Sequence, residues 1–448
     1  MSNFPSDLFA GSRFAVLGLG RNGWPTARAL AVMGAQVVAW DDQTSSIALA
    51  RDELSRCAGD VTIAALSDLS GYDALILSPG IPHSLPQPHP VAARARAAGV
   101  PILSDAELLF QAVRRAGSRA RFVGITGTNG KSTTTALVAH ILAEAGVPVA
   151  AGGNLGPAAL ALPLLGDSGV YVLEMSSYML ERLATLHFDA AAMLNLSADH
   201  LDRHGDLGGY AAVKRSIFDR QTEDDLAVVG TDDAPSRAMA AWLHARSARV
   251  IEISGAASTA LVADAPALPG AHNAQNAAAA WAICQFLGVT PDAIARGIAR
   301  FPGLSHRAQR VATIDGVTFV NDSKATNADA ASRALSCYRR VIWIAGGLAK
   351  SGGIEPLTSL FPRVAKALLI GRDAPALAAT LASHGVPCVD VGTLEAAVAA
   401  ALPAARECGA DVVLLSPACA SFDQFTGFDA RGDRFIDLVR GLCTVKAA

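Results

Sequence analysis

The stretch Gly127-Thr128-Asn129-Gly130-Lys131-Ser132-Thr133 decides the fold that this sequence predicts. Residues 121–125 predict a buried strand that enters it, and apolar residues at 137, 138, 141 and 142 predict a helix that leaves it. Glycines let backbone N–H groups approach phosphate oxygens, and a helix N-terminus favours an anion. Lys131 can reach the terminal phosphates, while Ser132 or Thr133 can offer a hydroxyl to Mg²⁺. The stretch therefore predicts a nucleotide-phosphate site between a strand and a helix.

Length, charge and cysteine usage restrict the class of protein. A chain of 448 residues exceeds what one hydrophobic core usually serves, so we expect two or three domains. The net charge of -3 argues against a polyanion-binding surface, and we expect no nucleic-acid partner. Seven cysteines without paired spacing predict a reducing, cytoplasmic environment and neither a zinc site nor a disulfide framework. No apolar run reaches the roughly 18 residues of a membrane helix, so we expect no membrane insertion.

The first hundred residues predict a Rossmann-like half of a doubly wound sheet, with strands at 14–17, 37–40 and 74–77. The first strand runs into Gly18-Leu19-Gly20-Arg21-Asn22-Gly23, and the second ends at Asp41. This spacing is typical of NAD-binding proteins, in which the acid accepts ribose hydroxyls. The same geometry suits a UDP-sugar, or a fold whose glycines merely pack. The motif alone does not choose between these three.

A second series of strands begins at the phosphate loop. Residues 170–173 predict a strand that ends at Glu174, and residues 191–194 predict another that leads through Asn195 to His200. Ligands of open α/β sheets gather at the carboxyl ends of the strands. Glu174 could be a solvated loop carboxylate and His200 a packed or capping histidine. Together with the phosphate loop, they favour a metal bound to the nucleotide.

A third series begins near residue 305, with strands at 317–320, 341–345 and 412–415. Each strand leads into a polar cluster, at 321–327, 346–350 and 416–425. Lys324 and Lys350 could clamp carboxylates or phosphates of a small charged substrate. No base for a thiol nucleophile is evident near Cys419, so we expect a small buried apolar role for it. The predicted domains are 1–106, 107–304 and 305–448.

On these residues the chain resembles the Mur ligase family along its whole length, and within that family the ligases that add D-glutamate. The central domain is matched by 127–133, 152–154, Glu174 with Ser176-Ser177, Asp199-His200 with Asp202-Arg203, and 270–273 with Asn276. The clusters at 321–327, 346–350 and 416–425 are similar to the third domain of the D-glutamate-adding members.

The resemblance implies three α/β domains: a Rossmann-like N-terminal domain, a central P-loop ATP-binding domain and a Rossmann-like C-terminal domain. The implied enzyme is an ATP- and Mg²⁺-dependent amide ligase of cytoplasmic peptidoglycan synthesis. It would join D-glutamate to UDP-N-acetylmuramoyl-L-alanine through an acyl phosphate. The first domain would then bind UDP and not NAD, and we expect a monomer.

The resemblance also implies roles for single residues. Catalysis is assigned to Lys131, Glu174, His200 and Lys214, the last as a carbamylated lysine. Mg²⁺ is assigned to Ser132, Glu174, His200 and carbamylated Lys214. ATP is assigned to Gly127, Thr128, Asn129, Gly130, Lys131, Ser132, Thr133, Thr134, Asn273, Asn276, Arg307 and Asp322. The UDP substrate is assigned to Arg21, Asn22, Asp41, Ser78, Gly80, Asn154 and Ser176. Glutamate is assigned to Thr326, Lys350, Ser421, Phe422 and Phe428.

Two departures from the family pattern concern substrate contacts. Met179 stands where the family commonly has glutamine, and a thioether cannot replace an amide's hydrogen bonds. Asp42 and Gln43 stand where a basic residue can occur, so contacts to the uracil end are expected to differ.

Three rival functions are also compatible with parts of the sequence. An NAD-dependent oxidoreductase leaves the phosphate loop and the Glu174 and His200 pair unexplained. A ligase like folylpolyglutamate synthase shares the central domain, but not the dedicated first domain or the sequence at 416–421. A nucleotide-gated regulatory ATPase would turn over ATP without depending on a UDP substrate.

Overall fold

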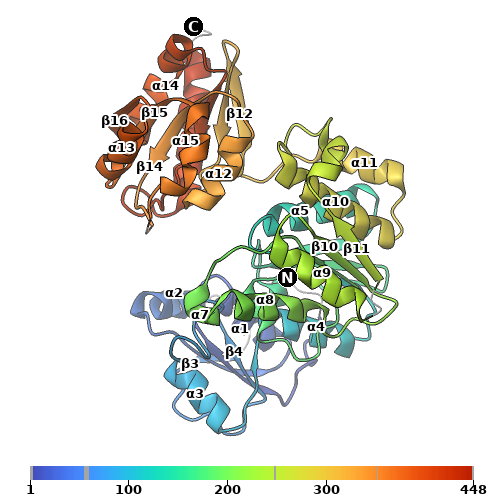
Figure 1. Cartoon of the computed structure of the whole chain (residues 1–448). Coiled ribbons are helices and arrows are strands. Elements are labelled where there is room, and N and C mark those ends of the chain that lie inside the picture. Colours follow the sequence, from blue (N-terminus) through green and yellow to red (C-terminus); the bar gives the residue numbers. More distant parts are fainter. Residues whose placement is uncertain (1–3, 55–59, 247–248, 351, 446–448) are drawn as a thin grey trace. The chain divides into compact units, whose positions relative to one another are not determined.

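Three β-sheets flanked by helices organise this chain (Figure 1). The computed structural model describes residues 4–54, 60–246, 249–350 and 352–445. The α/β fold class expected from the sequence is confirmed. Among the described residues, no helix is both long and apolar enough to cross a membrane.

The first sheet is parallel, with the strand order β3-β2-β1-β4-β5. Its strands are β1 (Arg13–Leu17), β2 (Gln36–Trp40), β3 (Val61–Ile63), β4 (Ala74–Leu77) and β5 (Ile102–Leu103). Its helices are α1 (Gly23–Val32), α2 (Thr44–Leu54), α3 (Pro90–Ala97) and α4 (Asp105–Arg115). Apolar residues of α1 pack on one face of the sheet and those of α3 on the other, because adjacent strand residues point to opposite faces.

The second sheet is also parallel, in the order β11-β10-β9-β6-β8-β7. Its strands are β6 (Arg121–Thr126), β7 (Val149–Gly153), β8 (Val170–Glu174), β9 (Ala190–Met193), β10 (Leu226–Gly230) and β11 (Arg249–Ile253). Its helices are α5 (Lys131–Glu144), α6 (Ser177–Leu180), α7 (Leu201–His204), α8 (Leu207–Arg215), α9 (Ala234–His244), α10 (Ala271–Phe286) and α11 (Pro291–Arg300). Since β6 lies between β8 and β9, the loops after these three strands open at the same edge of the sheet.

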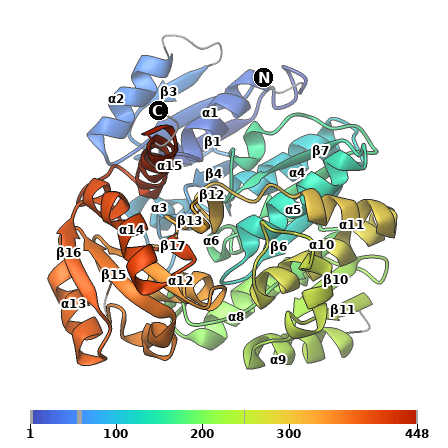
Figure 2. The ribbon, with the colours of Figure 1, turned by 90° about the horizontal axis from the view of Figure 1, so that it is seen from above.

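The third sheet has the order β12-β13-β17-β14-β15-β16. Its strands are β12 (Gln309–Ile314), β13 (Val317–Asn321), β14 (Val341–Gly346), β15 (Val364–Ile370), β16 (Cys388–Gly392) and β17 (Val412–Leu415). The edge strand β12 is antiparallel to β13, and the other pairs are parallel. Helices α12 (Ala328–Ser336) and α13 (Ala374–Ser383) cover one face, and α14 (Leu394–Cys408) and α15 (Phe428–Val445) cover the other (Figure 2).

The chain divides into two units. One comprises Met1–Leu261 with Ala274–Ala299 and holds the first two sheets; the other comprises Val262–Asn273 with Arg300–Ala448 and holds the third. The three sheets fall inside the three predicted residue ranges, but the boundaries at 106/107 and 304/305 stay predictions.

Within the first unit, the buried carboxylate of Glu107 ties α4 to the segment that follows α6. Its Oε2 accepts the backbone N–H groups of Ala184 and Leu186, both at 2.9 Å, and its Oε1 accepts that of Thr185 at 2.9 Å. The Thr185 hydroxyl and the Gln111 amide donate to Oε1 as well. Burial alone would raise the pKa of Glu107, but these donors outweigh it and the pKa lies below its ordinary value.

We predict that Glu107→Gln lowers the free energy of unfolding at pH 7 by about 3 kcal/mol, because an amide nitrogen would face backbone donors. A depressed carboxyl pKa contributes stability that is lost as the pH falls through the folded-state value. The difference in unfolding free energy between wild type and variant should therefore narrow below pH 4.5, the ordinary pKa of a glutamate carboxyl. Urea unfolding at pH 7 and pH 4 measures this difference in unfolding free energy. Glu223→Gln, at an exposed position, is the control. A gap that does not change with pH would contradict the role of the charge.

Candidate active site

The phosphate loop has the backbone conformation that its glycines permit. Gly127 and Gly130 have φ of +148° and +85°, and Gly130 is the N-cap of α5. A β-carbon on Gly130 would overlap the side-chain oxygen of Asn276, so both conformation and space require glycine there. The loop is fixed from the β9 side, because Asn195 accepts the backbone N–H groups of Thr128 and Asn129, both at 2.9 Å.

Lys131 folds back over this loop. Its Nζ donates to the carbonyl oxygens of Gly127 at 2.9 Å and Thr128 at 2.8 Å. Ser132 and Thr134 are buried behind it, and Thr133 is half-buried. The ammonium and the start of α5 therefore make this edge of the sheet electropositive.

Glu174 ends β8 beside the loop and is only 2% exposed. Its Oε1 accepts the Asn154 amide at 2.6 Å, whereas its Oε2 has no hydrogen-bond partner among the described residues. A buried carboxylate oxygen without a donor is costly unless a cation meets it. The Glu174 carboxylate and the Ser132 hydroxyl offer the oxygen ligands that a divalent cation such as Mg²⁺ prefers.

Lys214 on α8 is buried against the same loop and is 1% exposed. Its Nζ donates to the Gly127 carbonyl at 2.8 Å and to the Thr126 hydroxyl at 3.3 Å. Burial, and then the charge of Lys131, lower the pKa of Lys214 well below its ordinary value, while Asp199 and Glu174 act in the opposite direction. The amine therefore lies among charges of both signs, at the point where β6 ends.

His200 lies just before α7 in the left-handed conformation, with φ of +53°. Its side chain does not cap that helix, and its ring lies 5.0 Å from the ring of Tyr178. Burial lowers the pKa of His200, and the charges of Lys131 and Lys214 lower it further against the effect of Asp199. A neutral imidazole can offer a lone pair to a metal.

The carboxylate of Asp41 holds the glycine motif of the first sheet in place. Asp41 accepts the backbone N–H of Leu19 at 2.6 Å through Oδ2 and that of Gln43 at 2.8 Å through Oδ1. A β-carbon on Gly23 would overlap the Gly18 carbonyl oxygen, so this glycine serves close packing of α1. With both oxygens of Asp41 bonded to backbone, the geometry gives little support to an acid reserved for an NAD ribose.

Residues assigned to the UDP substrate approach the loop after β7. Asn22 donates to the Gly153 carbonyl at 3.5 Å and Arg21 to the Gly156 carbonyl at 3.3 Å. Asn154, next to Gly153, binds Glu174 as described. Ser78 donates to the Gly18 carbonyl at 2.9 Å. The first unit thus brings these residues and the phosphate loop to one region.

Two arginines, one just after α6 and one on α7, hold the turn that carries Ser78 and Gly80. Arg182, which is 2% exposed, donates to the carbonyls of Leu77 at 2.6 Å and Ile81 at 2.9 Å. Arg203 donates to the Gly80 carbonyl at 3.1 Å. No local pattern singles out Arg182 in the sequence, because an isolated arginine usually lies on the surface.

Met179 lies in the hydrophobic core and is 1% exposed. The Ser176 hydroxyl accepts the Met179 N–H at 3.3 Å and caps α6. The departure from glutamine therefore places an apolar side chain among apolar neighbours.

The second unit brings together the residues assigned to glutamate. Leu348 and Ala420 exchange backbone hydrogen bonds of 2.8 and 2.9 Å, which joins the loop of Lys350 to that of Ser421. Ser421 is buried, whereas Phe422 is 71% exposed. Lys324 Nζ lies 4.6 Å from the centre of the Phe428 ring. Thr326 is half-buried and Lys350 exposed.

The residues assigned to ATP fall in both units. Asn276 is in the first and adjoins Gly130, while Asn273, Arg307 and Asp322 are in the second. Asp322 accepts the Ser416 hydroxyl at 2.7 Å and the Ala308 N–H at 3.1 Å. Burial raises the pKa of Asp322 to about 6. Cys419 is fully buried, and burial raises the pKa of its thiol to about 12, as the expected apolar role requires.

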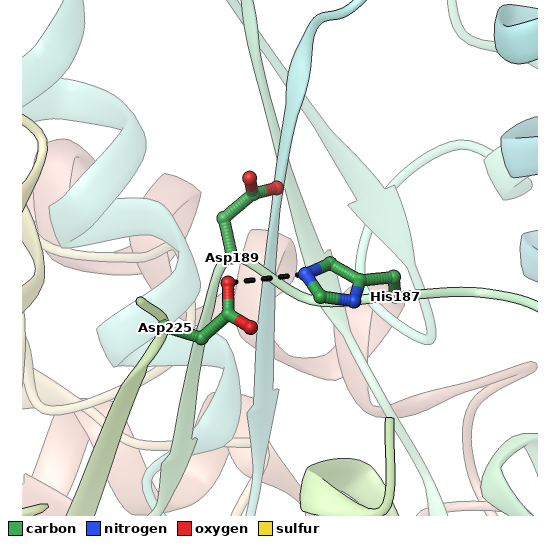
Figure 3. A group of neighbouring side chains, drawn as sticks. All are labelled: His187, Asp189 and Asp225. Carbon is green, nitrogen blue, oxygen red and sulfur yellow. Dashed lines mark hydrogen bonds and ion pairs between the residues drawn. The ribbon is translucent and has the colours of Figure 1, made fainter. Parts of the chain in front are cut away.

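A group of His187, Asp189 and Asp225 lies at the amino ends of strands of the second sheet (Figure 3). Asp189 and Asp225 directly precede β9 and β10. His187 pairs with Asp225 at 3.0 Å, and the acids accept the N–H groups of Phe122 at 2.7 Å and Thr222 at 2.6 Å. These bonds account for the group as part of the fold, away from the phosphate loop.

Comparisons with known proteins show what this chain is similar to. Residues 125–266 match the Mur ligase middle domain, and residues 306–419 match the Mur ligase, glutamate ligase domain. UDP-N-acetylmuramoylalanine–D-glutamate ligase of Paramagnetospirillum magneticum is 48% identical over 97% of both chains. The ligase of the same name from Rhodospirillum rubrum is 48% identical over 98% of this chain and 97% of that one.

Solved structures show the same fold at low identity. UDP-N-acetylmuramate-alanine ligase MurC of Thermotoga maritima superposes with a TM-score of 0.57 at 17% identity, over 96% of this chain and 99% of that one. MurF of Acinetobacter baumannii gives a TM-score of 0.58 at 16% identity, over 94% and 93%.

We predict that Gly130→Ala weakens ATP binding at least about tenfold, because either the loop or the Asn276 side chain, both assigned to ATP, must shift. The control is Gly146→Ala at the far end of α5, where φ is +77° and no atom lies within 4 Å of the added carbon. Both variants should lose about 1–2 kcal/mol for the positive φ. Calorimetric titration with ATP and thermal unfolding separate the two effects; equal ATP affinities would contradict the steric argument.

Proposed function

The chain belongs to the Mur ligase family, and we propose that it joins D-glutamate to UDP-N-acetylmuramoyl-L-alanine at the expense of ATP. The name of its relatives gives the same two substrates and the same reaction class, and the reaction belongs to peptidoglycan synthesis. The observation that carries the proposal is the convergence of Lys131, Glu174 and Lys214 on the loop after β6. A hydride-transferring enzyme would have no use for this group.

The reaction proceeds in two steps. An oxygen of the alanine carboxylate attacks the γ-phosphorus of ATP, and the bond from that phosphorus to the bridging oxygen breaks. ADP departs, and the alanine carboxylate is now an acyl phosphate. The glutamate amine then attacks the acyl carbon and loses a proton, and the carbon–oxygen bond to phosphate breaks. Phosphoryl transfer needs positioning and positive charge more than covalent help from the protein. Lys131, the loop N–H groups and the start of α5 supply that charge.

The residues that would hold Mg²⁺ are Ser132, Glu174 and His200, joined by Lys214 once it carries a carbamate. When bound, Mg²⁺ neutralises charge on the phosphate oxygens. Glu174 supports this most directly, because its free buried oxygen lies at the loop. The carbamate of Lys214 forms when carbon dioxide adds to the amine nitrogen, which releases a proton. This turns the neutral amine into an anion at the place where the metal would bind.

The UDP substrate is proposed to bind along Arg21, Asn22, Ser78 and Gly80. Asp41 contributes by shaping the glycine turn, and Asn154 and Ser176 lie nearer the muramoyl-alanine. A pocket of about 420 Å³ opens beside Asp41, lined in part by Trp40, Asp42, His89 and Arg94. His89 Nδ1 accepts the Val91 N–H at 3.2 Å, so its Nε2 carries the proton shared with Asp42 at 2.7 Å. The uridine end is proposed to enter this pocket, with this pair in place of a basic residue.

Glutamate is proposed to bind in the second unit at Thr326, Lys350, Ser421, Phe422 and Phe428. Lys350 suits a carboxylate, and the buried Ser421 offers a hydroxyl. ATP is proposed to bind at the loop, including Thr128 and Asn129. Further ATP-binding residues are proposed to be Asn273, Asn276, Arg307 and Asp322. The preference for the D-isomer, the monomeric state and the cytoplasmic location stay predictions.

Purified protein should release phosphate from ATP only when Mg²⁺, UDP-N-acetylmuramoyl-L-alanine and D-glutamate are all present. Lys131→Ala and Glu174→Ala should each lower this rate at least about 100-fold, as expected for groups that serve phosphoryl-transfer charge. Colorimetric phosphate release measures both, with L-glutamate as the stereochemical control. Equal turnover without the UDP substrate would favour a regulatory ATPase instead, and saturable NAD binding without UDP binding would favour an oxidoreductase.

Lys214→Ala should lose activity and regain part of it with acetate or formate, because a small carboxylate can replace the carbamate. An independent readout is a carbamate signal in ¹³C NMR of the wild type in ¹³C-bicarbonate, absent from Lys214→Ala. Lys366→Ala, in the second unit, is the control and should keep both the activity and the signal. A wild type without the signal would remove the modification from the proposal.

A further inference from the structure

Arg431 is a buried arginine on the first turn of α15, and only 1% of it is exposed. Its Nε donates to the Ser323 hydroxyl at 3.0 Å, and its Nη2 donates to the Ser323 carbonyl at 2.8 Å and the Cys419 carbonyl at 3.2 Å. Its Nη1 donates to the Gly346 carbonyl at 3.4 Å. One guanidinium thus contacts the chain after β13, at the end of β14 and after β17.

These three loops carry the residues proposed to bind glutamate. Ser323 precedes Thr326, Gly346 precedes Lys350, and Cys419 precedes Ser421, each by two to four residues. The Ser323 hydroxyl, which accepts from Arg431, in turn donates to the Phe428 carbonyl at 2.7 Å. Arg431 therefore lies where the four segments of that site meet.

The geometry of this contact is one that arginine alone can make. A guanidinium presents five N–H donors in a rigid plane, whereas a lysine ammonium is a single point on a flexible stem. Carbonyls that lose their donor in a buried place must shift or stay unsatisfied. Removing the guanidinium should therefore change the spacing of the loops, even where each strand stays folded.

Arg431 also brings a positive charge to the site. Among the described residues, every acceptor of its guanidinium is a neutral oxygen. Burial lowers the pKa of Arg431 to about 10, which leaves it cationic at neutral pH. The Asp423 carboxylate already acts on this cation and raises its pKa against the effect of burial. A cation whose hydrogen-bond acceptors are neutral favours a nearby anion, and glutamate carries two carboxylates.

We infer that Arg431 is the positioning residue of the glutamate site: by donating to three strand-end loops, it sets the spacing of the groups that bind glutamate. The inference rests on the proposed function, since it presumes that these loops bind glutamate. Arg431 touches no substrate in this account, and it acts through Thr326, Lys350, Ser421 and Phe428.

The test compares Arg431→Lys and Arg434→Lys with the wild type in the phosphate-release assay. Arg434 lies on the same helix, and its exposed guanidinium donates to Glu395 at 2.8 Å. Arg431→Lys should raise the KM for D-glutamate at least about tenfold and leave the KM values for ATP and the UDP substrate within about threefold. Arg434→Lys should leave all three unchanged. A purely structural role would instead reduce the folded fraction, and with it kcat, without moving one KM alone.

Ser323→Ala provides a second variant if Arg431→Lys does not fold. It removes one acceptor of Arg431 and the bond to the Phe428 carbonyl, and should raise the KM for D-glutamate about three- to tenfold with little change in thermal midpoint. An unchanged KM for D-glutamate in a folded variant, or an equal rise of all three KM values, would overturn the inference. A wild type that never requires D-glutamate would overturn the proposed function itself.

Discussion

The structure of the candidate site depends on the close approach of the loop after β6 to two side chains, Asn276 and Asn195. Gly130 touches Asn276 so closely that no side chain fits, and Asn195 accepts from two loop N–H groups. Because β6 lies between β8 and β9, the same loop is also reached by Glu174 and Lys214. The order of strands in the sheet thus places a buried carboxylate beside the phosphate loop.

Buried charged side chains position several loops of this chain. Glu107 gathers the N–H groups after α6, Arg182 gathers carbonyls after β4, and Arg431 gathers carbonyls after three strands. Each ion is bonded to backbone, which fixes the loop but leaves a net charge inside the protein. Glu174 goes further, with one buried oxygen that no described residue satisfies. Such a group costs stability until a cation binds, which is the expected cost of a metal site.

Much of the fold was predictable because local patterns and the sheets agree. Short apolar runs followed by glycine or polar clusters predicted β4 and β17 with the bounds that the structure shows, and others to within a residue or two. The antiparallel β12 was not predicted, since an edge strand with polar residues has a weak apolar signal. The glycine motif of the first sheet left three interpretations open. Its structure shows why: Asp41 and Gly23 serve the turn and the packing, whatever ligand binds.

The sequence by itself determined the fold class, the phosphate loop and the family, because these rest on residues close together in the chain whose spacing carries the chemistry. Only the tertiary structure decided which distant residues share a site and how their charges stand. In the sequence Lys214 looks like an ordinary surface lysine, whereas in the structure α8 buries it against Gly127. Met179 looks like a lost substrate contact in the sequence, whereas in the structure it lies in the hydrophobic core. Arg182 and Arg431 carry no local signal at all. Their roles arise from carbonyls far away in the chain, since burial and hydrogen bonding depend on what the fold brings near.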